Sequence, residues 1–283
     1  MTALANTLAL QQLAMQELKI RGRVDLAKVL PKAKGLRSIA KAKKMNAAVL
    51  TTGIKADTRR TSSIGVTVIV PTRNRLAELC RALNSLSAQS VLPNEVVIIN
   101  DGQPFDAFAT ERVRASLDPR IELKIVPGGG NGAAAARQLG CDTSTQPVIA
   151  YLDDDNIMMV NWIETITKEF AKPDVKAIYG AQIRTEFALG ILGREFNVEN
   201  LKQANYIDTG TIAHRRTVGR WDPSVKKLND WDFNLNMVLV ENVEYRYVPI
   251  LASLYFTDAP SRISDNGVNY LDLQGGIRAK YGI

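Results

Sequence analysis

The chain has 283 residues, of which 46% are hydrophobic and 23% are charged, which is the composition of an ordinary globular protein. This composition excludes a disordered chain, a collagen-like fibre and a disulfide-stapled miniprotein. No apolar run reaches the roughly 18 residues of a membrane-spanning helix, and the N-terminus lacks the basic leader of a secretory signal. Two cysteines, Cys80 and Cys141, and one histidine, His214, exclude a disulfide framework and a zinc site of thiolates and imidazoles. We therefore expect a cytoplasmic protein.

The net charge of +7 is concentrated near the N-terminus. Residues 1–60 contain 13 Lys and Arg against three acids, a balance of +10, whereas the remaining chain has 23 bases and 26 acids, a balance of −3. A body that wraps nucleic acid needs a basic face, so we expect no nucleic-acid partner. Residues 1–60 read as a basic helical extension. It can lie as a peripheral contact on the inner face of the membrane, pack on the body or join two subunits, and the sequence leaves these alternatives open.

From residue 64 onward, short apolar segments alternate with helical patterns, after a linker at 58–63. The apolar periodicity predicts strands at 65–71, 94–101, 121–127, 147–152 and 175–183, and helices at 76–86, 106–117, 132–142 and 161–171. Near-continuous Val and Ile runs separated by helices predict an α/β fold with a mostly parallel sheet that is buried on both faces. Ligands of such sheets bind at the carboxyl ends of the strands.

Carboxylates follow two of these strands. Asp101 comes after the second strand, and Asp153, Asp154 and Asp155 come after the fourth. Three consecutive carboxylates repel one another unless water or a cation compensates their charge. Asp153 and Asp155 are alternate residues of an extended segment, so they can face one ion, and carboxylate ligands suit Mg²⁺ or Mn²⁺. A solvated acidic turn before the next helix is the alternative.

The segment after the third strand fits a second motif. Residues 130–135 read G-x-G-x-x-A, they open a helix, and Asp153 lies 23 residues beyond Gly130. This pattern is typical of a dinucleotide-binding loop, so an NAD(P)-dependent Rossmann oxidoreductase is an alternative. Against it, a complete βαβ unit ending in Asp101 precedes the motif, and a ribose needs one acid. A metal with a nucleotide diphosphate explains three acids better.

Four segments in this order resemble the nucleotide-binding half of the family 2 glycosyltransferases, which have the GT-A fold. They are VTVIVPTRNR (66–75), EVVIINDGQ (95–103), GNGAAAARQLG (130–140) and VIAYLDDDN (148–156). The family has strands that end P-T-x-N and D-D-G-S, a glycine segment leading to A-R-N-x-G, and a metal-binding D-x-D. A weaker match continues through 206–216 and 228–235 to about residue 256. The resemblance implies a Rossmann-like GT-A domain over 64–256, with a donor half at 64–160, an acceptor half at 161–256 and a C-terminal tail at 257–283.

The resemblance also implies roles on the donor side. Pro71 and Thr72 would lie along the nucleotide. Asp101 would accept a hydrogen bond from the base, which selects a uracil-type or thymine-type donor, so the expected donor is UDP-linked. Asp153 and Asp154 would contact the ribose or support the metal.

The remaining implied roles concern the metal and the reaction. Asp155, with Asp153, would bind Mn²⁺ or Mg²⁺, and Asp230 would be the catalytic base of an inverting hexosyl transfer. The acceptor hydroxyl would belong to a glycan, a lipid-linked or a protein acceptor, and a non-catalytic module of the same fold is a further alternative. This sequence departs from the family pattern where it has Asn100, Gln103, Gln138 and Asn229.

Five other side chains have more ordinary interpretations. At helical spacing, Trp231 and Phe233 are core residues more often than sugar platforms. Asp208 is expected to cap a helix or loop, although it can also reach an acceptor. His214 is expected to make a structural hydrogen bond. Arg137 can pair with the aspartates or steady a diphosphate, and the sequence does not decide between these roles.

Overall fold

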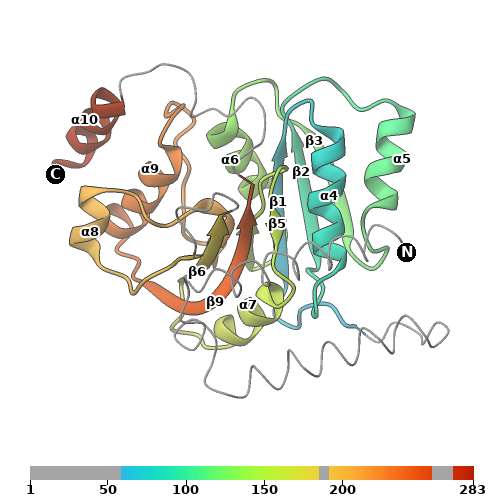
Figure 1. Cartoon of the computed structure of the whole chain (residues 1–283), viewed down its shortest axis with the longest axis horizontal. Helices are drawn as coiled ribbons and strands as arrows, with labels where there is room; N and C mark the ends of the chain where they lie inside the picture. Colours follow the sequence, from blue (N-terminus) through green and yellow to red (C-terminus); the bar gives the residue numbers. More distant parts are fainter. Residues whose placement is uncertain (1–58, 185–190, 257–269) are drawn as a thin grey trace.

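The computed structural model describes residues 59–184, 191–256 and 270–283, so the basic extension up to residue 58 and the start of the predicted tail lie outside the described residues. In these ranges one mixed sheet of nine strands is flanked by helices (Figure 1). Its strand order is β3-β2-β1-β4-β8-β6-β9-β5, and β7 pairs with β6. Among the described helices, none combines the length and the apolarity that crossing a bilayer requires.

The first half of the sheet is parallel. It contains β1 (Val66–Thr72), β2 (Glu95–Asn100), β3 (Glu122–Pro127) and β4 (Val148–Tyr151). Helices α4 (Leu76–Ser87) and α5 (Ala107–Ala115) cover one face. Helix α6 (Ala133–Thr143) covers the other face. Because side chains alternate along a strand, Val68 packs toward α4 and Ile69 toward α6.

The predicted strands and helices of this half are confirmed to within a residue or two. The expectation that every strand is buried on both faces is wrong for β3. This strand is half-exposed along its length because it lies at the edge of the sheet, with β2 as its one neighbour. The charged residues Glu122 and Lys124 occupy it, as is common on edge strands.

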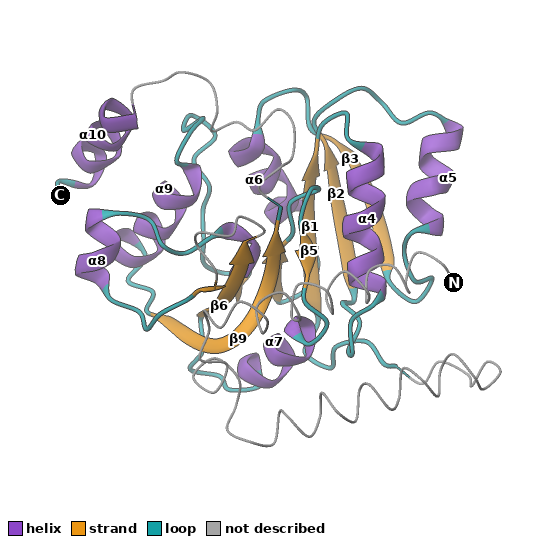
Figure 2. Ribbon diagram, in the orientation of Figure 1, coloured by secondary structure: helices purple, strands orange, loops and turns teal. Residues whose placement is uncertain are grey.

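The second half is mixed. It contains β5 (Ile157–Met158), β6 (Ala177–Arg184), β7 (Ile191–Leu192), β8 (Ile212–Arg215) and β9 (Tyr245–Tyr255). The intervening helices are α7 (Trp162–Phe170), α8 (Val198–Gln203), η1 (Thr209–Thr211), α9 (Asn229–Leu235), the continuing turn η2 (Asn236–Val240) and α10 (Tyr270–Tyr281). Figure 2 shows α8, α9 and α10 grouped at the end of the molecule far from β3.

Strand β8 lies between β4 and β6 and is antiparallel to both. Ala150 of β4 pairs with Ala213, and Val148 pairs with Arg215. The beginning of β8 therefore lies at the carboxyl end of β4. This pairing brings η1 to the same edge as the residues that follow β4.

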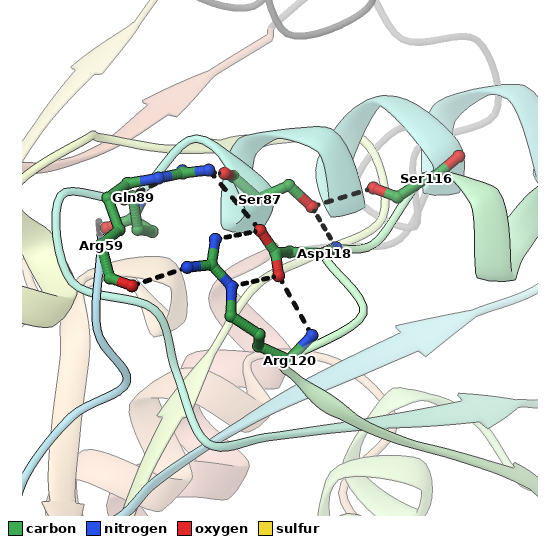
Figure 3. A network of polar contacts seen from close by, with 6 residues as sticks. All are labelled: Arg59, Ser87, Gln89, Ser116, Asp118 and Arg120. Atoms are coloured by element: carbon green, nitrogen blue, oxygen red, sulfur yellow. Dashed lines mark hydrogen bonds and ion pairs between the residues drawn. The ribbon is translucent and has the colours of Figure 1, made fainter. Parts of the chain in front are cut away.

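A polar cluster at the amino ends of the parallel strands fixes the point where the chain enters the described body (Figure 3). Arg59 lies 3.5 Å from the carboxylate of Asp118 and donates to the carbonyl of Ser87. Arg120 pairs with Asp118 at 2.7 Å and donates to the carbonyl of Arg59 at 2.6 Å. The hydrogen bond from Arg120 lowers the pKa of Asp118. Residue 59 is thus anchored at the amino ends of the strands, away from the edge where ligands of such sheets bind.

A second polar cluster is buried beneath α9. The Nδ1 of His214 lies 2.8 Å from the carbonyl of Arg215, so Nδ1 carries the proton and Nε2 accepts from the Tyr151 hydroxyl at 2.8 Å. The indole of Trp221 donates to the same hydroxyl at 2.9 Å. The interpretation of His214 as a structural hydrogen-bonding residue is confirmed. Cys141 lies 3.2 Å from Tyr151, and both cysteines are buried and free.

Acidification from about pH 7.5 to about pH 5 is expected to remove about 2 kcal/mol of unfolding free energy through His214. Burial lowers the pKa of His214 from 6.5 to about 4, so the unfolded chain takes up a proton before the folded chain does. This contribution to stability is complete above the unfolded pKa and is lost as the pH falls toward the folded value. Urea unfolding of the wild type and of His214→Gln at both pH values measures it.

The comparison between the two proteins isolates the histidine. Asp154 and Asp208 have pKa values raised to about 6, which favours the folded state on acidification, and both remain in the variant. We expect the variant to lose less stability than the wild type between the two pH values. An equal loss in both proteins would contradict the assignment to His214.

Candidate active site

The acidic triplet follows β4 and is held by the loop after β1. Asp154 is 6% exposed and accepts from the Thr72 hydroxyl at 2.7 Å. Arg75, which precedes α4, lies 2.8 Å from Asp155 and 3.4 Å from Asp154. Burial raises the pKa of Asp154 to about 6. Burial and the charge of Asp153 also raise the pKa of Asp155, so the predicted repulsion within the triplet is present.

Arg137 of α6 connects the triplet to α9. Its guanidinium donates to Asp153 at 2.6 Å and to the Asn229 side chain at 3.1 Å. The guanidinium also lies over the Trp221 ring, 4.9 Å from its centroid. Of the two roles that the sequence left open for Arg137, the structure shows the first, which is pairing with an aspartate. The residue joins the end of β4 to the first residue of the helix that carries Asp230.

The carboxylates of the triplet are suitable ligands for a divalent ion whose other ligands come from a diphosphate. Within the part of the chain that the structure describes, no three Asp, Glu, His or Cys side chains are grouped as a metal cage. Mg²⁺ and similar ions commonly take one or two carboxylates and complete their shell with water and phosphate oxygens, and Asp153 and Asp155 supply ligands of this type. Burial and, after it, the charge of Asp153 raise the pKa of Asp155, and a bound cation would favour the ionised form of this carboxyl.

The glycine segment after β3 wraps around Asp101. The backbone amides of Asn131 and Gly132 donate to its two carboxylate oxygens at 3.0 and 2.9 Å. Gly132 has a φ of 91°, which favours glycine, and a Cβ on Gly128 would lie 2.7 Å from Asp101. In a dinucleotide-binding loop such amides hold a pyrophosphate. Here they hold a carboxylate, which weakens the oxidoreductase alternative.

Two of the predicted nucleotide contacts occupy the end of β1. Pro71 is half-buried and pairs with Ile99 of β2. Thr72 is buried and directs its hydroxyl to Asp154. In this structure Thr72 therefore orients an aspartate at the carboxyl end of the parallel strands.

Asp230 lies in the first turn of α9, which begins after Leu228 with a φ of 55°. Its carboxylate accepts from the Trp231 amide at 2.9 Å and from the Asn205 side chain at 2.7 Å. Burial raises the pKa of Asp230, and Arg137 works against this rise. Asp230 thus lies on a helix, next to the residue that Arg137 bonds.

Asp208 stands at the start of η1 and accepts from the Gly210 amide at 2.9 Å. Its predicted role as a cap is confirmed. Burial, together with the charges of Asp153 and Asp230, raises its pKa to about 6. Asp208 therefore lies close enough to Asp153 and Asp230 for their charges to act on it.

The aromatic residues near Asp230 belong to the core, as expected. Trp231 and Phe233 are 1% and 0% exposed. Trp221 stacks on Phe233 with ring centroids 4.2 Å apart. These rings fix α9 against the sheet and are not available as platforms for a sugar.

The C-terminal helix α10 packs on α9 from the other side. Lys280 lies 2.6 Å from Asp232, and the Tyr281 hydroxyl lies 2.9 Å from the same carboxylate. Asp232 is 1% exposed, so these two groups satisfy a buried charge. The sequence assigned no role to this helix, which nevertheless supports the element that carries Asp230.

Sequence reasoning missed Arg75 and Asn205. Arg75 lies in the segment 66–75, just after a predicted strand whose carboxyl end shares one side of the sheet with the strand before the triplet, and this placement was a usable signal. Asn205 lies in a loop without any motif, and no local pattern marks its bond to Asp230.

Comparison with known proteins supports the interpretation of the strand-end motifs. The family model "Glycosyl transferase family 2" matches residues 67–216, more than half of the chain. The uncharacterized glycosyltransferase YwdF of Bacillus subtilis (strain 168) is 24% identical over 233 residues, covering 77% of this chain and 84% of that protein. An uncharacterized glycosyltransferase of Haemophilus influenzae is 27% identical over 187 residues, and the match covers 61% of this chain and 62% of that relative, which is less than two thirds of its length.

Solved structures show the same fold. S. aureus TarS 1–349 in complex with UDP-GlcNAc aligns with a TM-score of 0.61 and 15% identity over 76% of this chain and 66% of that chain. The mannosyltransferase PcManGT from Pyrobaculum calidifontis, in complex with GDP-Man and Mn²⁺, aligns with a TM-score of 0.52 and 17% identity over 92% of this chain and 70% of that chain. The fold is GT-A, as the resemblance implied. With its strand-end motifs and the match over residues 67–216, the chain belongs to glycosyl transferase family 2.

Proposed function

We propose that this protein is a metal-dependent, inverting glycosyltransferase that moves a hexose from a UDP-type nucleotide sugar to an acceptor hydroxyl of a glycan, a lipid-linked or a protein acceptor. The donor half is residues 64–160, and the acceptor half is residues 161–256. One observation carries the proposal. Arg137 pairs with Asp153 of the donor half and bonds Asn229, next to Asp230 of the acceptor half.

On the donor side, Asp101 accepts the N–H of a uracil-type base. Its oxygens each hold one backbone amide and keep a further lone pair for this bond. Pro71 lies along the nucleotide, and Asp153 and Asp154 contact the ribose. TarS was solved with UDP-GlcNAc, which supports a uridine nucleotide as the donor.

Asp155, with Asp153, holds Mn²⁺ or Mg²⁺. PcManGT was solved with Mn²⁺, and the carboxylate oxygens here suit such an ion. The bound ion supplies neutralisation of the charge on the departing diphosphate. Arg75 and Arg137 keep the triplet compensated and oriented.

On the acceptor side, Asp230 takes the proton of the acceptor hydroxyl. The oxygen then forms a bond to the anomeric carbon as the bond from that carbon to the diphosphate oxygen breaks, on opposite faces of the sugar. The proton remains on the Asp230 carboxylate, and the electron pair leaves with the diphosphate. Burial raises the pKa of Asp230, which makes the carboxylate a stronger base than one in water.

Thermal unfolding with UDP and Mn²⁺ tests the donor half. At a ligand concentration about 100 times the Kd, binding adds about 2.7 kcal/mol, which raises the Tm by roughly 4–5 °C in a protein of this size. We expect Asp155→Ala to remove this rise, because it removes the proposed metal ligand. The matched control is Asp174→Ala, an exposed aspartate paired with Arg246, which keeps the rise. If no uridine nucleotide stabilises the wild type, the proposed function is wrong.

A further inference from the structure

We propose that Asn205 is a positioning residue for the Asp230 carboxylate, and that Asn234 and Tyr245 hold Asn205 in the required orientation. The inference rests on the proposed role of Asp230 as the base. It concerns residues to which the sequence assigned no role and which lie in three different elements: the loop after α8, helix α9 and strand β9.

Asp230 accepts one hydrogen bond at each of its carboxylate oxygens. Its Oδ2 accepts from the Asn205 amide at 2.7 Å, and its Oδ1 accepts from the Trp231 backbone amide at 2.9 Å. Each carboxylate oxygen thus has one donor, and the two donors come from different segments. A carboxylate fixed at both oxygens cannot rotate freely, so its remaining lone pairs keep a constant direction.

The neighbours of Asn205 fix the orientation of its side-chain amide. Its Oδ1 accepts from the Asn234 side chain at 3.1 Å and from the Ile207 backbone amide at 3.3 Å. Because both of these partners are N–H donors, the oxygen of the amide must face them, and the NH₂ group must face Asp230. A flipped amide would place two oxygens against each other at the carboxylate.

Asn234 is itself held by two hydrogen bonds. Its Nδ2 donates to the Ile207 carbonyl at 2.9 Å, and its Oδ1 accepts from the Tyr245 hydroxyl at 2.8 Å. Asn234 is fully buried, so its amide has no water to turn toward. Tyr245 donates to Asn234, Asn234 donates to Asn205, and Asn205 donates to Asp230. Hydrogen bonds connected in this way polarise and strengthen one another.

The charged groups around Asp230 show why a neutral donor matters there. Arg137 from α6 attracts the carboxylate, whereas Asp208 from the loop before η1 repels it. Asp232 on α9 is already paired with Lys280 of α10. Asn205 is the side chain that bonds Asp230 directly. It favours the ionised form of the base without adding a charge beside Asp230.

Carbon-13 NMR titration of the aspartate carboxyl groups tests the inference. The full-length protein is labelled at aspartate, and Asp230→Asn assigns the resonance. In Asn205→Ala the pKa of Asp230 is expected to rise by about one unit or more, because a bond to the charged form is lost. Asn205→Asp is expected to raise it further, since a like charge then faces the carboxylate.

Tyr245→Phe provides a second measurement if the substitutions at Asn205 prevent folding. It removes one hydroxyl at the far end of the chain, and a smaller rise in the Asp230 pKa is expected. The matched control is Tyr247→Phe, two residues further along β9, whose ring packs on Tyr179; it is expected to leave the titration unchanged. An Asp230 pKa that is the same in wild type, Asn205→Ala and Tyr245→Phe would overturn the inference.

This titration needs no substrate, so the two proposals fail separately. If uridine nucleotides do not stabilise the wild type, the proposed function is wrong while a shifted titration still supports the contact between Asn205 and Asp230. If nucleotides do stabilise it and the titration is unchanged, the enzyme assignment stands and the positioning role is wrong.

Discussion

Asp230→Asn is expected to slow sugar transfer about 10²–10⁴-fold, the usual contribution of a positioned general base. The amide has nearly the same shape as the carboxylate, but it cannot take the proton of the acceptor hydroxyl. The proposed nucleotide contacts are Asp101 and the triplet after β4, so binding of the donor is expected to survive. The measurement is the release of UDP from a UDP-sugar, with water or an acceptor library, in both proteins.

The controls separate loss of chemistry from loss of folding. Asp230→Asn should keep the rise in Tm with UDP and Mn²⁺, because Asp230 touches neither in the proposed arrangement. Asp174→Asn, a substitution of the same kind at an exposed site paired with Arg246, should leave the rate unchanged. Equal rates in the wild type and Asp230→Asn would remove the base assignment. Absence of transfer to any acceptor would favour the non-catalytic alternative.

The donor half could be predicted from sequence because its information is local. Val and Ile runs define buried parallel strands, and the carboxylates proposed for the donor side follow the ends of two of these strands. Asp101 and residues 153–155 were therefore placed at one edge by topology alone. The glycine segment was recognised as well, although its amides bond Asp101 instead of a pyrophosphate.

The acceptor half was harder because its contacts join distant segments. Strand β8 has four residues, too few to reveal that it runs antiparallel between β4 and β6. Asn205 bonds a residue 25 positions away, and Lys280 pairs with a residue 48 positions away. An asparagine in a loop and a lysine in a terminal helix have ordinary solvated roles, so the sequence gives no reason to single them out.

Lys280→Met is expected to lower the unfolding free energy by about 3 kcal/mol, near the lower end of the cost of breaking a buried ion pair. Asp232 is 1% exposed, and without Lys280 the Tyr281 hydroxyl would be the remaining side-chain donor that contacts its carboxylate. The lysine is itself 34% exposed, which keeps the loss near the lower end because water can reach part of the site. Urea unfolding at neutral pH measures the change.

A matched substitution on the surface shows whether burial is the cause. Lys202 pairs with the exposed Glu199 at 2.8 Å, and Lys202→Met should cost less than about 1 kcal/mol. The double variant Lys280→Met with Asp232→Asn should recover part of the loss, because the buried charge is then absent. If the two lysine substitutions cost the same, α10 does not hold α9 through this pair. If Lys280→Met lowers the unfolding free energy as expected, it should also lower the transfer rate. Helix α9 carries Asp230, and the hydrogen bond between Asp230 and Asn205 depends on the position of that helix.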